Sequence, residues 1–282
     1  MDRELVLGVL LLMVCGPILL AFGALPALAK NDVSGRRLER DLWARLWVPL
    51  LPAALAFAGL LGWAIQEPDA ADEHLHGIAL ALAAPFAAIW VRAIARSAWA
   101  LLATRHQTPI ATVGFLRPRV VVAPFVRHAI DAEAFQAAYE HEAAHVRHRD
   151  PLRIWLAQLA ADLQWPWPSA KRRLRCWLWA LELARDEEAR EHGAEGADLA
   201  VAILTAITLA GTPDAVAAAA LTGDGAALKE RIARLLAPVV DDSPVRARWV
   251  ASLCTLTALS VAVMAGLHYG DLVVRALPGV LP

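Results

Sequence analysis

Four long apolar segments restrict what this chain can fold into. They cover residues 5–29, 46–65, 77–101 and 248–268. Each has about the 20 residues that a helix needs to cross the hydrocarbon core of a bilayer. The chain has 282 residues, of which 58% are hydrophobic, whereas about 45–50% is usual in a soluble domain. We therefore expect a mainly α-helical protein with four transmembrane helices in the lipid bilayer.

The first apolar segment has two interpretations. The Ala-Leu-Ala before Lys30 resembles a cleavage site, which would make the segment a removable signal peptide. However, its apolar core is longer than the roughly 7–15 residues of a typical signal sequence. It is also preceded by Asp2, Arg3 and Glu4 rather than by a basic region. We therefore expect a retained span.

The distribution of lysine and arginine predicts the orientation, because loops rich in these residues stay in the cytoplasm. The loop at 30–45 contains Lys30, Arg36, Arg37, Arg40 and Arg45, whereas the loop at 66–76 contains neither residue type. This bias places both termini outside. The resulting division is a three-span region at 1–103, a cytoplasmic domain at 104–245, a fourth span at 246–268 and an outer tail at 269–282.

The charged and sulfur-containing residues exclude some functions. The net charge is −1, so no direct binding of nucleic acid is expected. Cys15, Cys176 and Cys254 form no CxxC pair and are expected to be free thiols. The segment KRRLRCWLW at 171–179 combines basic residues with two tryptophans. It is either a solvated helix end or a contact with anionic lipid headgroups.

The predicted cytoplasmic domain is mostly helical and contains one short β-hairpin. The hairpin is expected within 109–124, where β-branched residues alternate with glycine and proline. Asp131 is a suitable N-cap for the helix that follows it. Helices are expected at 131–149, 152–164, 170–192, 197–211 and 226–238.

The sequence HEAAH at 141–145 points to a metal site. Residues four apart on a helix lie on one face, so His141 and His145 could bind the same ion. Neutral imidazole is a good ligand for Zn²⁺. Glu142 is placed to take a proton from a zinc-bound water, as in other HExxH sequences.

A catalytic zinc site needs a third protein ligand and one open position. Glu182 is the expected third ligand, because it lies on an otherwise apolar helix face. Asp186, one turn later, could accept the outer N–H of a ligating histidine. Two alternatives stay open: His148 is a weaker ligand candidate, and Glu182 could instead form a salt bridge with Arg185 or Arg173.

Several segments together resemble the BlaR/MecR-type integral-membrane zinc metallopeptidases, the antirepressor transducers of bacterial β-lactam sensing and their standalone relatives. The matching segments are GFLRPRVVVAP (114–124), HEAAHVRHRDP (141–151), WPWP (165–168), ELARDEEA (182–189) and LKERIARLL (228–236). With the spans, the resemblance covers nearly the whole chain. Membrane peptidases of the CAAX-prenyl and heat-shock types share the HExxH and ExxxD elements but differ in the arrangement of their spans.

The resemblance implies a gluzincin-like domain that binds one Zn²⁺ per chain. Its implied site consists of the ligands His141, His145 and Glu182, the general base Glu142, the supporting Asp186 and Asp150, and a substrate-binding edge at Arg119, Val120, Val121 and Val122. The implied location is the bacterial cytoplasmic membrane. The implied substrate is a cytoplasmic protein, such as a BlaI/MecI-type winged-helix repressor.

One departure from the family concerns the signal. The family's transducers carry a penicillin-binding sensor domain after the fourth span, whereas only the short tail at 269–282 follows it here. We therefore expect a sensor-less member, for which a separate sensor protein is one candidate partner and the activating signal stays open. A quality-control or processing protease and a non-catalytic scaffold stay open as alternatives. His106 and His128 stay open as residues that stabilise the oxyanion.

Overall fold

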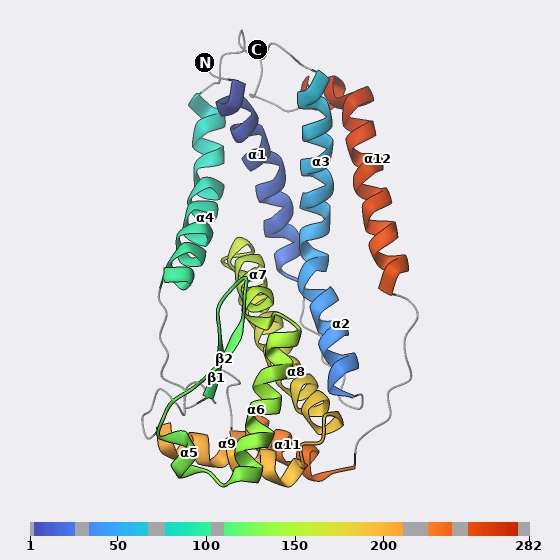
Figure 1. Ribbon diagram of the computed structural model, residues 1–282. Helices are drawn as coiled ribbons and strands as arrows, with labels where there is room; N and C mark the ends of the chain where they lie inside the picture. Colours follow the sequence, from blue (N-terminus) through green and yellow to red (C-terminus); the bar gives the residue numbers. More distant parts are fainter. Residues whose placement is uncertain are drawn as a thin grey trace.

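Four helices form a bundle at one end of the molecule, and a second helical body lies below it (Figure 1). This computed structural model describes residues 3–25, 34–66, 77–102, 110–210, 225–238 and 248–275. The bundle consists of α1 (Arg3–Gly23), α3 (Leu51–Gln66), α4 (Gly77–Leu102) and α12 (Arg248–Arg275). The lower body contains α2 (Gly35–Trp47), α5 (Val126–Ala129), α6 (Ala132–Arg147), α7 (Asp150–Leu163), α8 (Pro168–Glu191), α9 (Gly196–Ala210), α11 (Gly225–Leu236) and a two-stranded sheet. The expectation of a mainly helical chain is confirmed.

Three described segments are long and apolar enough to cross a membrane, judged by length and composition. They are Leu5–Gly23, Gly35–Ile65 and Gly77–Leu101. The predicted fourth span falls in α12, whose apolar stretch Cys254–Gly270 is shorter. Its helical character is therefore confirmed, but its length as a complete span is not.

Glycines allow α3 and α12 to pack with their backbones in close contact. A Cβ atom on Gly266 would lie 1.9 Å from the carbonyl oxygen of Gly59, and one on Gly62 would lie 2.1 Å from that of Val263. No larger residue fits at these positions without moving a helix. Small residues at helix crossings are typical of membrane bundles, where close packing replaces hydrophobic burial.

We expect Gly266→Leu to separate α3 from α12 and to lower the free energy of unfolding by at least about 2 kcal/mol, because overpacked side chains displace backbone. Thermal unfolding in detergent micelles measures the change. Gly8→Leu in α1 is the matched control, since nothing lies within 4 Å of a Cβ atom there. Equal melting temperatures for the two variants would contradict the close crossing.

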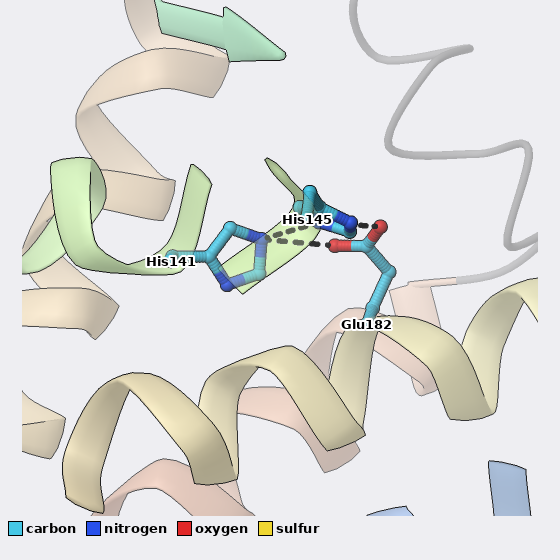
Figure 2. A group of neighbouring side chains, drawn as sticks. All are labelled: His141, His145 and Glu182. Atoms are coloured by element: carbon cyan, nitrogen blue, oxygen red, sulfur yellow. Dashed lines mark hydrogen bonds and ion pairs between the residues drawn. The ribbon is translucent and has the colours of Figure 1, made fainter. Parts of the chain in front are cut away.

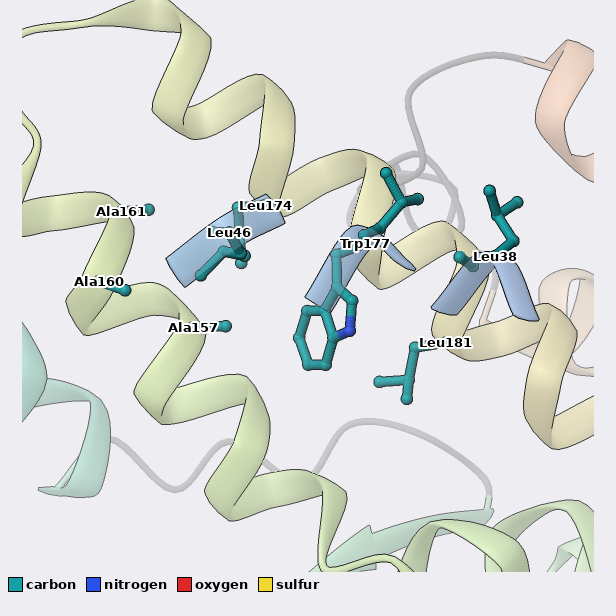
Figure 3. Close-up of a cluster of buried hydrophobic side chains, with 10 residues drawn as sticks. Leu38, Leu46, Ala157, Ala160, Ala161, Leu174, Trp177 and Leu181 are labelled. Carbon is teal, nitrogen blue, oxygen red and sulfur yellow. The ribbon is translucent and has the colours of Figure 1, made fainter. Parts of the chain in front are cut away.

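Helix α2 connects the bundle to the lower body. It continues into α3 through a short 3-10 helix, Val48–Leu50, and packs its apolar face on α8. Figure 3 shows Leu38, Leu46 and Trp177 in this core, which α7 completes with a row of alanines. The carboxylate of Glu187 accepts hydrogen bonds from the first backbone N–H groups of α2. The lower body is thus held directly beneath the bundle.

The sheet consists of β1 (Ile110–Val113) and β2 (Arg119–Val122), which pair antiparallel as the predicted hairpin. The register places Thr112 opposite Val120. Both strands pack on α6, which begins after Asp131, whose carboxylate accepts a hydrogen bond from the N–H of Ala134 at 2.8 Å. The predicted N-cap is therefore confirmed. The next helix begins at Asp150, before Pro151, and the left-handed Arg149 (φ 53°) separates it from α6.

Candidate metal centre

Helices α6 and α8 bring the three predicted ligands together (Figure 2). The Nε2 atoms of His141 and His145 are 3.1 Å apart. Glu182 approaches both rings, with Oε2 3.4 Å from His141 Nε2 and Oε1 3.7 Å from His145 Nε2. Both histidines are buried, and Glu182 is partly exposed. Glu182 therefore forms the more solvent-exposed side of the group.

This donor set fits Zn²⁺. Tetrahedral zinc with bonds of about 2.0–2.1 Å places its ligand atoms about 3.3 Å apart. The three observed separations, 3.1, 3.4 and 3.7 Å, lie around that value. In addition, two imidazole nitrogens that face each other at 3.1 Å repel unless a cation or a shared proton lies between them. Imidazole and carboxylate ligands also match the chemistry of zinc.

A carboxylate lies beside the outer nitrogen of each histidine, as a hydrogen-bond partner of His145 and at ion-pair distance from His141. Asp186 Oδ1 lies 2.8 Å from His141 Nδ1, and Asp150 Oδ2 lies 2.8 Å from His145 Nδ1. An N–H on Nδ1 leaves Nε2 with its lone pair free for a metal. The structure thus places both predicted supporting aspartates next to the histidine that each would orient.

Each of these aspartates accepts two hydrogen bonds from one arginine. Arg185 donates from Nε at 2.5 Å and from Nη2 at 3.0 Å to the oxygens of Asp150. Arg231, from α11, donates from Nε at 2.6 Å and from Nη2 at 2.8 Å to Asp186. Its Nη1 also lies 3.0 Å from Glu182 Oε2. The site therefore contains two parallel arginine–aspartate–histidine chains.

The alternative salt bridge of Glu182 with Arg185 or Arg173 is wrong. Glu182 pairs with Arg231 instead, and Arg185 turns toward Asp150 and Glu188. Arg173 donates to Gly23 and Leu25 carbonyl oxygens. The sequence did not indicate a role for Arg231, because α11 meets α8 only in the folded chain.

The charges of the site stabilise one another. Burial by itself would raise the pKa of Asp150, but His145 and Arg185 outweigh it and hold the pKa well below its usual value. Burial likewise disfavours the charged form of Glu182. The positive charge of Arg231 and the hydrogen bond with His141 outweigh this effect and lower the pKa of Glu182. Burial disfavours the charged ring of His141, yet the carboxylates of Asp186 and Glu182 raise its pKa to about 10. Without metal, the His141 ring is therefore protonated on both nitrogens and positively charged at neutral pH.

Metal binding should consequently release a proton. Because the pKa of His141 in the metal-free site is about 10, apparent affinity for Zn²⁺ should rise about tenfold per pH unit below that pH. Calorimetric titration near neutral pH, in two buffers with different ionisation enthalpies, counts the protons. We expect at least one proton released for each ion bound. A binding heat that is the same in both buffers would contradict a protonated His141.

Glu142 is held beside the metal group by a residue that the sequence did not single out. Thr112 Oγ1 lies 2.7 Å from Glu142 Oε2 and 2.8 Å from the Glu142 carbonyl oxygen. Its single hydroxyl proton can serve one of these acceptors at a time. Only the register of the hairpin on α6 places this threonine here, so spacing along the chain gave no signal for it.

The predicted substrate-binding edge corresponds to β2. Val120 and Val122 are half-buried, whereas Arg119 and Val121 are exposed on the other face. Since cross-strand partners share a face, Val120 lies on the same side of the sheet as Thr112. Among the described residues β2 pairs only with β1, and the contact with Glu142 comes from β1 rather than from this predicted edge.

The remaining candidates lie apart from the metal group or outside the described part of the chain. His148 Nε2 lies 2.7 Å from Glu188 Oε2, away from the three ligands, so the preference for Glu182 over His148 agrees with the structure. His106 and the side chain of His128 lie outside the described residues.

Comparison of the chain with protein-family models, with curated proteins and with solved structures found no match. The function is therefore inferred from the residues of the site and from the arrangement of the helices around it.

Proposed function

We propose that this protein is a membrane-bound zinc metalloendopeptidase of the BlaR/MecR type. The observation that carries the proposal is the convergence of His141, His145 and Glu182 within 4.8 Å, with Glu142 adjacent on α6. Three protein ligands and an open fourth position are the arrangement of catalytic rather than structural zinc sites. A glutamate that directly follows the first ligand is the usual base in such sites.

His141, His145 and Glu182 would hold the ion, which supplies Lewis acidity toward a water molecule and the scissile carbonyl. Glu142 accepts a proton from the attacking water as the new C–O bond forms. It then delivers this proton to the amide nitrogen as the C–N bond breaks, so the base is regenerated. Thr112 restricts the rotation of the Glu142 carboxylate. Asp186 and Asp150 keep the two imidazoles in the ligating tautomer.

The bundle of α1, α3, α4 and α12 would span the cytoplasmic membrane of a bacterium. The beginning of α1 and the end of α12 lie at the same end of the bundle, and α6, which contains His141 and His145, lies beyond the opposite end (Figure 1). This agrees with the orientation expected from the arginine-rich loop at 30–45, in which the metal centre is cytoplasmic.

The substrate would be a cytoplasmic protein segment. By resemblance, it is a BlaI/MecI-type repressor, cleaved in response to a separate sensor protein. The alternative enzyme is a processing or quality-control protease. The two differ in whether the substrate is freely soluble or anchored in the membrane.

The test begins with protein purified in detergent micelles. We expect about one zinc per chain by elemental analysis and hydrolysis of unfolded casein. Removal of the metal with a chelator should stop hydrolysis, and added Zn²⁺ should restore it. A zinc-free protein that cannot be loaded would refute the metal site. Bound zinc without any hydrolysis of casein or repressor would favour the non-catalytic scaffold.

Glu182→Ala should lose the metal. Removal of an outer-shell partner typically costs about 10–100-fold in metal affinity, so loss of a ligand should exceed about 100-fold. Competition with a chromophoric chelator measures the dissociation constant. Glu191→Ala is the matched control, because Glu191 is on the same helix but is half-exposed and pairs with Arg36. Full zinc affinity in Glu182→Ala would show that the third ligand is wrong.

A further inference from the structure

The tip of the β-hairpin reaches the lower end of the helical bundle. The rings of Phe115, at the tip, and Trp155, on α7, meet edge to face with centroids 5.2 Å apart. Trp155 in turn donates from Nε1 to the carbonyl oxygen of Ser97 on α4, at 3.0 Å. Ser97 belongs to the apolar segment Gly77–Leu101. The hairpin tip therefore lies level with the last turns of a proposed span.

A second set of contacts places the α7–α8 turn at the same height, beside the end of another bundle helix, α1. In the turn between α7 and α8, Trp167 donates to the carbonyl oxygen of Leu20, and Ser169, in the first turn of α8, donates to that of Gly23. Both acceptors lie in the last turn of α1. Asp162, near the end of α7, is 3.1 Å from Arg96 of α4. Hence the α7–α8 corner and the hairpin tip both lie where the spans end.

The side chains exposed at this level suit a membrane surface. Leu116 at the hairpin tip is 72% exposed, and Trp99 of α4 is 71% exposed. Trp165 of the α7–α8 turn is also exposed. Tryptophan prefers the boundary between membrane and water. An exposed leucine at the same level would bury its side chain in the bilayer rather than remain in water.

Three cationic side chains at the start of α8 also favour a position at the membrane surface. Lys171, Arg172 and Arg175 are exposed. Arg175 lies three and four residues after the other two, so its side chain is close to both on the helix surface. Within the described part of the chain, none of them pairs with a carboxylate. Arg173 points the other way, to Gly23 at the end of α1. Of the two interpretations of this basic segment, contact with anionic headgroups fits its position at the end of the spans.

The metal centre lies close to this level. Thr112, which contacts Glu142, is four residues from Leu116 along the hairpin. A strand rises about 3.3 Å per residue, so Thr112 lies at most about 13 Å along the hairpin from Leu116. A peptide that added to the hairpin as a further strand would run along this same direction.

We propose that the metal centre acts on extended peptide segments that lie directly at the cytoplasmic membrane surface, as in membrane-anchored proteins. This inference rests on the proposed function and narrows its substrate class. A segment that emerges from the bilayer beside the hairpin tip reaches Glu142 within a few residues. A folded soluble protein would have to bring its cleavage site to the same depth. The geometry thus favours processing of membrane proteins over cleavage of a freely soluble repressor.

The test uses one membrane-anchored substrate in which three cleavable copies compete for the same enzyme. A single membrane span is followed by three identical copies of an unstructured casein segment at increasing distance from the bilayer. It is reconstituted with the enzyme in vesicles of phosphatidylethanolamine and phosphatidylglycerol. All copies share one tether, so a general rise in local concentration acts on all of them. We expect the proximal copy to be cut about tenfold faster than the distal copy, with cut sites mapped by mass spectrometry.

Equal cutting of the three copies, or faster cutting of the same segment in free solution, would overturn the inference but leave the proposed function intact. Absence of all cutting would overturn both. Leu116→Asp should reduce the preference for the proximal copy without changing cleavage of the soluble segment in detergent. Leu204→Asp is the matched control, since Leu204 is 48% exposed on α9, in the lower body.

A measurement that does not depend on activity tests the depth itself. Leu116→Cys, in a background whose native cysteines are replaced by alanine, is labelled with a fluorophore. Lipids that carry a nitroxide on the headgroup or near the top of the acyl chain should quench this label, and they should leave a label on Leu204→Cys unquenched. An unquenched label at position 116 would overturn the membrane-proximal placement.

Discussion

Glu142→Gln should abolish most of the peptide hydrolysis while one zinc per chain remains bound. Glutamine keeps the size and the hydrogen bond with Thr112, but it cannot accept a proton from water. A general base typically contributes about 10²–10⁴-fold to the rate, so kcat should fall by that factor with little change in KM. Because Glu142 is not among the three converging ligands, the affinity for zinc should stay near that of the wild type.

Glu140→Gln is the matched control for this experiment. Glu140 lies on the same helix, two residues earlier, and contacts Gln136 and Arg147 at the surface. Its substitution should leave both the zinc content and kcat unchanged. A Glu142→Gln variant with wild-type kcat would assign the base to another residue. Loss of zinc from Glu142→Gln would mean that this carboxylate is a ligand.

The centre of this site could be predicted from the sequence because its parts are local. The spacing of His141 and His145 on one helix and of Glu182 and Asp186 on another fixes which side chains share a face. The helices themselves were predicted by capping residues and by proline and glycine, and their ends differ by only a few residues from the structure. The pairing of the two helices was inferred from Glu182, a carboxylate on an otherwise apolar helix face, and the resemblance implied the same ligand.

The parts that could not be predicted depend on contacts between distant segments. Arg231 is 45 residues from Asp186, and Thr112 is 30 residues from Glu142. Each reaches the site only because α11 packs on α8 or because β1 packs on α6. Neither side chain differs in type or spacing from ordinary surface residues. Glu182 was assigned the wrong salt-bridge alternatives for the same reason, since Arg185 is nearer in sequence but faces Asp150.

Arg185→Met should have the largest effect on stability. Arg185 is buried and binds both oxygens of Asp150, which is completely buried. Methionine fills much of the volume but removes both hydrogen bonds from Arg185, and of the two arginines that pair with Asp150 only the more exposed Arg153, 3.0 Å from Oδ1, remains. Breaking a buried ion pair by removing one partner costs about 3–5 kcal/mol. For a chain of this size, that loss should lower the melting temperature by about 10 °C.

The surface pair of Arg36 and Glu191 provides the control for Arg185→Met. Both of its side chains are about one-third to one-half exposed, so Arg36→Met should cost no more than about 1 kcal/mol. Arg185→Lys restores the charge without the two-pronged contact and should recover part of the stability. If Arg185→Met melts like Arg36→Met, Asp150 does not depend on its arginine. Should Arg185→Met melt early but recover its melting temperature when zinc is added, then the arginine–aspartate–histidine chain and the metal hold His145 by alternative means.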